Sequence, residues 1–142
     1  MGSEGLVAAL CTFQQKVAPI HKESRAQYGL YADLQTILAT ITPPLTECGL
    51  VIMQTFTTDA AGRPLLRTTL KHISGESETS VAPLILSEGR NVLHMWGGAV
   101  TYQRRYAILA ILNLAAGIED DDGDIASTKM VKPASRVTDD FI

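Results

Sequence analysis

The sequence predicts an α+β fold, in which a three-stranded antiparallel meander is packed with helices and followed by one long helix. Apolar residues recur first at helical spacing, then at every second position, and finally at helical spacing again. Turn-forming residues separate the runs that have the two-residue period. A chain of 142 residues is long enough to bury a core of its own as one domain.

The part of the chain before the sheet is predicted to contain two helices. Residues 5–20 have apolar side chains at helical spacing, and Pro19 ends or kinks this first helix. The polar, glycine-containing residues 21–31 predict a loop. Residues 32–41 predict the second helix, and the two prolines that follow predict a break with one further turn behind it.

The three strands are predicted at residues 50–58, 65–73 and 77–86. In the second strand, Arg67 and Lys71 share one face, while leucines and His72 occupy the other. This strand therefore has one basic, polar face and one largely apolar face. Pro83 has no backbone N–H to donate, so the third strand is expected at a sheet edge or at a bulge.

The long helix is predicted over residues 97–114, because no helix breaker follows its two opening glycines. Its second half is apolar on nearly every side and should be buried, and Tyr106 is expected to join it in the core. Arg104 and Arg105 are about 100° apart on the helix, so we expect that both cannot be hidden. Either one pairs with a carboxylate and the other is solvated, or both serve an anionic ligand, and the pattern leaves these two alternatives open.

The distribution of charge divides the chain into a core domain, residues 1–118, and an acidic tail, residues 119–142. The core domain has nine basic and eight acidic residues, whereas the tail has three basic and seven acidic residues. We expect the tail to be disordered, because it is polar with scattered charges. The acidic run that opens the tail lacks the spacing of an EF-hand loop, so we interpret it as an exposed connector.

Several functional classes find no support in the sequence. Cys11 and Cys48 lie in apolar helical patterns without metal-ligand spacing, which predicts reduced core thiols in a cytoplasmic protein. His72, Ser74 and Glu76 occupy a strand end and its turn, which favours a structural turn over a catalytic triad. The sequence has no phosphate-binding loop, and we expect neither a signal peptide nor a membrane span. We therefore expect no enzyme activity, no cofactor and no bound metal.

The basic residues of the sheet and of the long helix suggest a binding surface. If the helix packs beside the sheet, Arg67, Lys71, Arg104 and Arg105 can line one groove, with Tyr102 as a stacking surface. Such a groove suits single-stranded nucleic acid, because cations follow the phosphates and aromatic rings stack on the bases. We therefore predict these five residues as the DNA-binding set.

Four blocks of the sequence resemble a known family. They are YADLQTILATITPPLTECG at residues 31–49, LKHISGE at 70–76, GAVTYQRRY at 98–106 and EDDDG at 119–123. In order and spacing they resemble the ERF, or essential recombination function, family of phage single-strand annealing proteins, over about residues 5–124. The third block, followed by an acidic run, is fairly specific for this family.

The resemblance implies a β-β-β-α core and assembly into rings or helical filaments. It also implies ATP-independent binding and annealing of single-stranded DNA in phage-type homologous recombination and repair, in the host cytoplasm. It implies that Arg104 and Arg105 contact phosphate, and it matches Tyr102 and Tyr106 to the two tyrosines of the motif. Gln103 stands where alanine is common, a difference that we expect not to matter. An exonuclease or a host single-strand-binding protein is a further partner to consider.

Two other classes of function stay open at this point. A metal-dependent enzyme acting on nucleic acid would use His72, Glu76 or the acidic run, and its activity would disappear with a chelator. An oligomeric scaffold would assemble without DNA, and a labelled oligonucleotide would then show no change in anisotropy.

Overall fold

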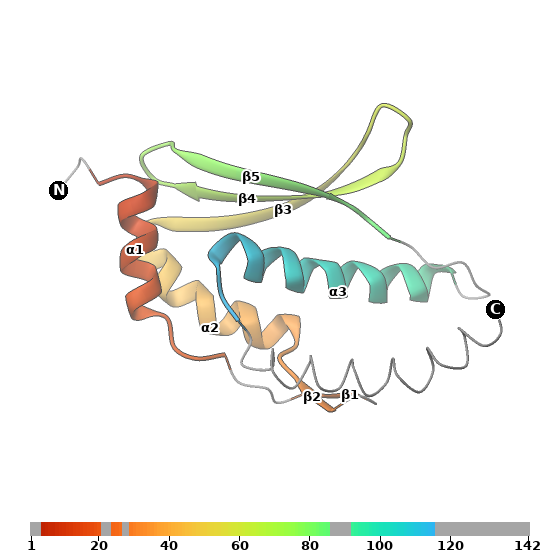
Figure 1. The fold of residues 1–142 in the computed structure, drawn as a ribbon, viewed down its shortest axis with the longest axis horizontal. Helices are drawn as coiled ribbons and strands as arrows, with labels where there is room; N and C mark the ends of the chain where they lie inside the picture. The colour runs from red at the N-terminus through yellow and green to blue at the C-terminus, as the bar shows by residue number, and fades with distance from the viewer. Residues whose placement is uncertain (1–3, 21–23, 27–28, 86–91, 116–142) are drawn as a thin grey trace, which may run out of the picture.

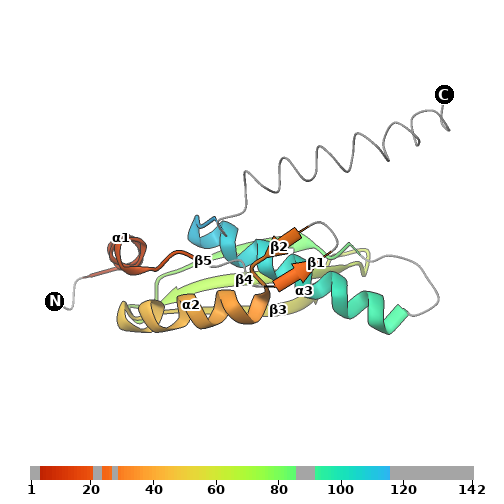
Figure 2. The ribbon, with the colours of Figure 1, turned by 90° about the horizontal axis from the view of Figure 1, so that it is seen from below.

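In the described part of the chain, a three-stranded main sheet has helices packed on one of its faces. The computed structural model describes residues 4–20, 24–26, 29–85 and 92–115. The sheet has the order β3-β4-β5, and both pairs of strands are antiparallel. In Figure 1 α2 and α3 lie beneath the sheet and α1 stands at its left end, and the view from below in Figure 2 shows α2 and α3 in front of the sheet. The predicted α+β meander followed by a long helix is therefore confirmed.

The N-terminal helices begin with different kinds of cap. Helix α1 (Leu6–Lys16) follows Gly5, which has no side chain to offer, whereas α2 (Leu34–Glu47) follows Asp33. The carboxylate of Asp33 accepts a hydrogen bond from the backbone N–H of Thr36 at 2.7 Å, as a capping residue should.

The two prolines lie inside α2 and do not break it, so the predicted interruption is wrong. Pro43 and Pro44 each remove one backbone donor from the helical ladder. Ile41 and Leu45 lie four residues apart on either side of them, and both are buried in the core. Burial of this face stabilises the helix enough to offset the lost hydrogen bonds.

A short hairpin occupies part of the segment that was predicted as a loop. Strand β1 (Ser24–Ala26) pairs antiparallel with β2 (Gly29–Tyr31), and together they form a separate two-stranded sheet. Three residues are too few to show the alternation that identifies a strand in sequence.

The register of the main sheet places the buried residues of β4 on one face and its two cations on the other. Strand β3 (Leu50–Thr58) pairs along its whole length with β4 (Pro64–His72), and β4 pairs with β5 (Ser77–Pro83). Leu66, Thr68, Leu70 and His72 of β4 are buried. They form the face that the helices cover, and the intervening residues form the opposite face, on which no helix of the described residues packs; we call it the face without helices. Strand β5 lies at an edge, which confirms the prediction from its proline.

Helix α3 (Val92–Leu112) crosses the covered face of the sheet. It begins before the two glycines, which are exposed and are tolerated inside the helix. It ends at Asn113, which has a positive φ of 54°, and the next N–H donates back to the Leu109 carbonyl at 2.8 Å. Ile108 and Leu112 are fully buried, so the prediction that the second half of this helix is buried is confirmed.

The two cysteines differ in exposure. Cys48 is buried at the end of α2, whereas Cys11 is exposed on α1, so the expectation of two core thiols is wrong for Cys11. Within the described residues, no helix is long and apolar enough to cross a membrane. The acidic tail of residues 119–142 lies outside the described residues.

Candidate nucleic-acid interface

Arg104 lies between α3 and the sheet and is held there by a glutamine. Its Nε donates a hydrogen bond to Oε1 of Gln54 on β3 at 2.8 Å, and the side chain is half-buried. Nε2 of Gln54 donates in turn to Oγ1 of Thr68 at 3.0 Å and to the Arg104 carbonyl at 3.3 Å. Among the described residues, the terminal nitrogens of Arg104 have no hydrogen-bond partner. The guanidinium is thus fixed at one edge, and its other nitrogens remain available to a ligand.

Arg105 packs against two tyrosine rings on the same helix. Its guanidinium carbon lies 5.5 Å from the ring centroid of Tyr102 and 5.5 Å from that of Tyr106. The two ring centroids are 4.7 Å apart, and the ring planes are inclined by 52°. Arg105 is only 8% exposed, whereas Tyr102 is 52% and Tyr106 is 44% exposed. We call these three residues the α3 cluster.

The two tyrosines of the α3 cluster point away from the sheet, whereas Arg105 is buried. Each tyrosine is two positions from Arg104, which is about 200° around the helix, and Arg104 contacts β3. The expectation that Tyr106 lies in the core is therefore wrong, because the fully apolar half of α3 begins one residue later. Of the two arginines only Arg105 is buried, whereas Arg104 is half-buried, in agreement with the expectation that both cannot be hidden. An amide partner for Arg104 and aromatic rings beside Arg105 offset part of the loss of water.

Arg67 and Lys71 lie on the opposite face of the sheet. Arg67 pairs in register with Thr55 and Val81, and Lys71 pairs with Val51, so all of them share the face without helices. Both cations are exposed, as are Val51 and Val81. The expectation that these two cations line one groove with Arg104 and Arg105 is therefore wrong. Helix α3 needs an apolar surface to pack on, and strand alternation places the cations on the other one.

The comparison with protein families adds an independent observation. The model of the ERF superfamily matches residues 6–140. The chain belongs to the ERF superfamily. The match continues past residue 124, where the resemblance of the four blocks ends, and covers most of the acidic tail. No curated protein and no solved structure matches the chain. Membership supports a function of the recombination and strand-annealing type in general.

The LKHISGE block of this ERF chain forms a turn that caps α1. Oε1 of Glu76 accepts from the backbone N–H of Leu6 at 3.0 Å and lies 3.2 Å from Oγ of Ser74. Nδ1 of His72 accepts from the backbone N–H of Ser74 at 3.1 Å rather than from its hydroxyl. The serine therefore has no histidine base in hydrogen-bond contact, and the three side chains are not arranged as a triad. A Cβ at Gly5 would collide with Glu76, so glycine permits this close approach.

Gln103 of the GAVTYQRRY block connects α3 to the segment after β5, a contact that the sequence did not predict. Its Oε1 accepts from the backbone N–H of Ile85 at 3.2 Å, and its Nε2 donates to the Ile85 carbonyl at 3.1 Å. The side chain thus fixes the segment that follows β5 onto α3. An alanine could form neither bond, so the glutamine has a structural contact that was not expected from the sequence. The pairing is not visible in sequence, because the partners are 18 residues apart.

Proposed function

We propose that this ERF chain binds single-stranded DNA and anneals complementary strands without ATP, in phage-type homologous recombination. The observation that carries the proposal is the α3 cluster, in which two exposed tyrosine rings on the outer face of the helix pack beside the buried guanidinium of Arg105. Stacking of a base on an aromatic ring contributes about 1–3 kcal/mol and tolerates any sequence.

A phosphate contact is proposed on the side of α3 that faces the sheet, opposite the two rings. Gln54 holds Nε of Arg104 in place, and the terminal nitrogens of Arg104 can donate hydrogen bonds to a phosphate oxygen. Because the side chain is already fixed, binding costs little further side-chain entropy. Arg105 adds positive charge beside the rings. Contacts to phosphate carry no sequence information, so any strand can be held while the edges of its bases remain free to pair.

Arg67 and Lys71 stay in the proposed DNA-binding set as a separate surface. They are exposed on a face whose other described residues are apolar or carry hydroxyl groups, with no acidic side chain among them. This face attracts a polyanion, but a strand that lies on the α3 cluster does not cross it directly, because the sheet intervenes. The two surfaces are therefore tested by different variants.

The decisive experiment replaces both rings of the α3 cluster. The variant Tyr102→Ala with Tyr106→Ala is expected to bind a labelled oligonucleotide at least about fivefold more weakly, in line with the loss of one stacked base. The matched control, Tyr102→Phe with Tyr106→Phe, keeps the π-faces and should bind like the unmodified chain. Fluorescence anisotropy measures binding, and energy transfer between two complementary labelled strands measures annealing without ATP. Equal affinity of the alanine variant and the unmodified chain would contradict the proposal.

Assembly into a ring or filament is part of the proposed function. Strands β3 and β5 are both edge strands of the main sheet and present backbone groups that a neighbouring copy can pair with. Electron micrographs with and without single-stranded DNA test this point. A chain that stays monomeric in both conditions would argue against it. Assembly combined with flat anisotropy would instead support a scaffold without DNA binding.

A further inference from the structure

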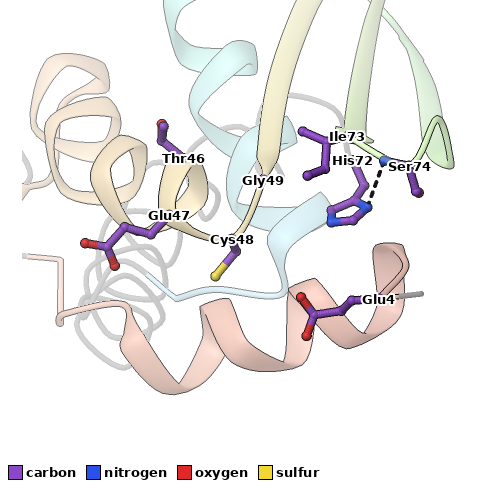
Figure 3. Close-up of a pocket in the computed structure, with 8 residues that line it drawn as sticks. All are labelled: Glu4, Thr46, Glu47, Cys48, Gly49, His72, Ile73 and Ser74. Atoms are coloured by element: carbon purple, nitrogen blue, oxygen red, sulfur yellow. Dashed lines mark hydrogen bonds between the residues drawn. The ribbon is translucent and has the colours of Figure 1, made fainter. Parts of the chain in front are cut away.

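A pocket lies between the C-terminal end of α2, the C-terminal end of β4 and Glu4, which precedes α1 (Figure 3). Its volume is about 450 Å³, which is within the range of sites for small ligands or for a side chain of a partner. Glu4, Glu47, Cys48, Gly49 and His72 are among the residues that line it. None of the residues of the α3 cluster lines this pocket.

The imidazole of His72 is largely buried, and its Nε2 is a donor at the surface of the pocket. The residue is only 5% exposed, and its Nδ1 accepts the backbone N–H of Ser74. In the neutral ring the proton is therefore on Nε2, which has no hydrogen-bond partner among the described residues. Figure 3 shows this side of the ring turned into the pocket. Because Nε2 carries the proton, it can donate a hydrogen bond to a ligand but has no lone pair for a metal ion.

Access to this donor depends on Gly49. A Cβ at this position would lie 3.4 Å from Nε2 of His72 and 3.0 Å from the side chain of Ile73. The missing side chain therefore leaves the space beside Nε2 open. The positive φ of 72° at Gly49 also favours glycine, so one residue serves both the turn and the pocket.

The opening of the pocket is negatively charged. Glu4 and Glu47 are exposed carboxylates, and the C-terminus of α2 adds the negative end of the helix dipole. Lys16 lies 3.5 Å from Glu47, but both side chains are largely exposed, at 49% and 63%. Such a surface pair contributes little energy, and a ligand cation can share the carboxylate.

We propose that this pocket binds an arginine or lysine side chain of a partner protein. The cation would pair with one of the two carboxylates, Glu4 or Glu47, and the main-chain carbonyl of the same residue would accept the hydrogen bond from His72 Nε2. This combination of a cation and a neutral acceptor on one residue matches the two kinds of group in the pocket. A nucleic-acid strand does not fit here, because its phosphates would face two carboxylates. The proposal is independent of DNA binding by the α3 cluster.

The test uses the full chain labelled with ¹⁵N and the probe N-acetyl-L-argininamide. The probe is expected to shift the Nε2 resonance of His72 and the amide resonance of Gly49. The matched probe N-acetyl-L-citrullinamide has nearly the same shape without the charge, and it should bind at least about tenfold more weakly, since a charge-assisted hydrogen bond contributes about 1.5–3 kcal/mol. Spermidine has charges but no carbonyl, and it should leave the Nε2 resonance unchanged.

Two variants identify the groups responsible. Glu4→Gln with Glu47→Gln removes the charges and should weaken binding of the arginine probe at least about tenfold. His72→Asn keeps an oxygen near the position of Nδ1 for the Ser74 N–H but removes the Nε2 donor, and it should also weaken binding while the folded spectrum persists. Unchanged resonances with the arginine probe at millimolar concentration, or equal binding of the citrulline probe, would overturn the proposal. Tighter binding of spermidine than of the arginine probe would do the same.

Discussion

Adjacent residues of identical chemistry have different environments in α3. Arg104 is held by an amide on the sheet, and Arg105 packs on two rings on the outer side of the helix. The sequence identifies the pair as unusual, because two permanent charges lie on one turn of a helix that is otherwise apolar. It does not identify the partners, because Gln54 is 50 residues away and is an ordinary strand residue in the pattern.

The variant Arg104→Ala is expected to affect stability as well as binding. Removing the guanidinium leaves Oε1 of the half-buried Gln54 without its donor, at a cost of about 1–3 kcal/mol. Urea unfolding followed by circular dichroism measures this loss. The double variant Arg104→Ala with Gln54→Leu removes both partners and should recover part of it. No recovery would mean that the hydrogen bond is not the source of the loss.

Contacts between distant segments fix the ends of elements in this fold. Helix α1 has no capping side chain of its own at Gly5, and Glu76 supplies the acceptor from a turn that is 70 residues away. Gln103 likewise fixes the chain after β5. The strands themselves were predicted within a few residues, because the two-residue period is local. The continuation of α2 through Pro43 and Pro44 was not predicted, because burial of the apolar face of α2 outweighs the helix-breaking effect of the two prolines.

The contact between Gly5 and Glu76 should behave as a coupled pair. Glu76→Ala removes the cap of α1 and is expected to cost about 0.5–2 kcal/mol of unfolding free energy. Gly5→Ala brings a methyl group against the carboxylate and should also destabilise the fold. The double variant should lose less than the sum of the two single losses, because alanine at position 76 removes the collision. Additive losses in denaturant unfolding would show that the two residues do not interact.

The hairpin between β3 and β4 should respond to acid through Asp59. The backbone N–H of Arg63 is the main cause that lowers the pKa of this carboxyl below its usual range, and the Arg63 side chain acts in the same direction. A carboxyl with a lowered pKa stabilises the fold above its unfolded pKa, and this contribution disappears as the pH falls through the folded pKa. The difference in unfolding free energy between the unmodified chain and Asp59→Asn should therefore shrink on acidification. A difference that is constant from neutral to acidic pH would contradict this assignment.

Two potential DNA-contacting surfaces lie on opposite sides of the whole molecule. Tyr102 and Tyr106 face away from the sheet on the side covered by helices, and Arg67 and Lys71 lie on the other face of the sheet. Figure 1 shows α3 on one side of the sheet. A single molecule therefore cannot form the one continuous groove expected from the sequence.

Salt dependence measures how many cations contact the strand. For single strands, the logarithm of the binding constant falls with the logarithm of salt concentration, with a slope of about −0.7 for each neutralised phosphate. If Arg67 and Lys71 each contact one phosphate, replacing both by alanine should make the slope less steep by about 1.4. Lys16→Ala is the matched control, because this lysine lies beside Glu47 on a different part of the surface. An unchanged slope in the double variant would remove Arg67 and Lys71 from the DNA-binding set.

The sequence by itself determined the α+β class, the order of the strands, the buried half of α3 and the likeness to the ERF superfamily. These follow from local periodicity and from short blocks of residues, which can be read along the chain. Only the tertiary structure decided which face of β4 the helices cover, which tyrosines remain exposed and which residues hold Arg104. Those outcomes depend on the competition of distant segments for one apolar surface, because each helix packs where the most apolar area can be buried.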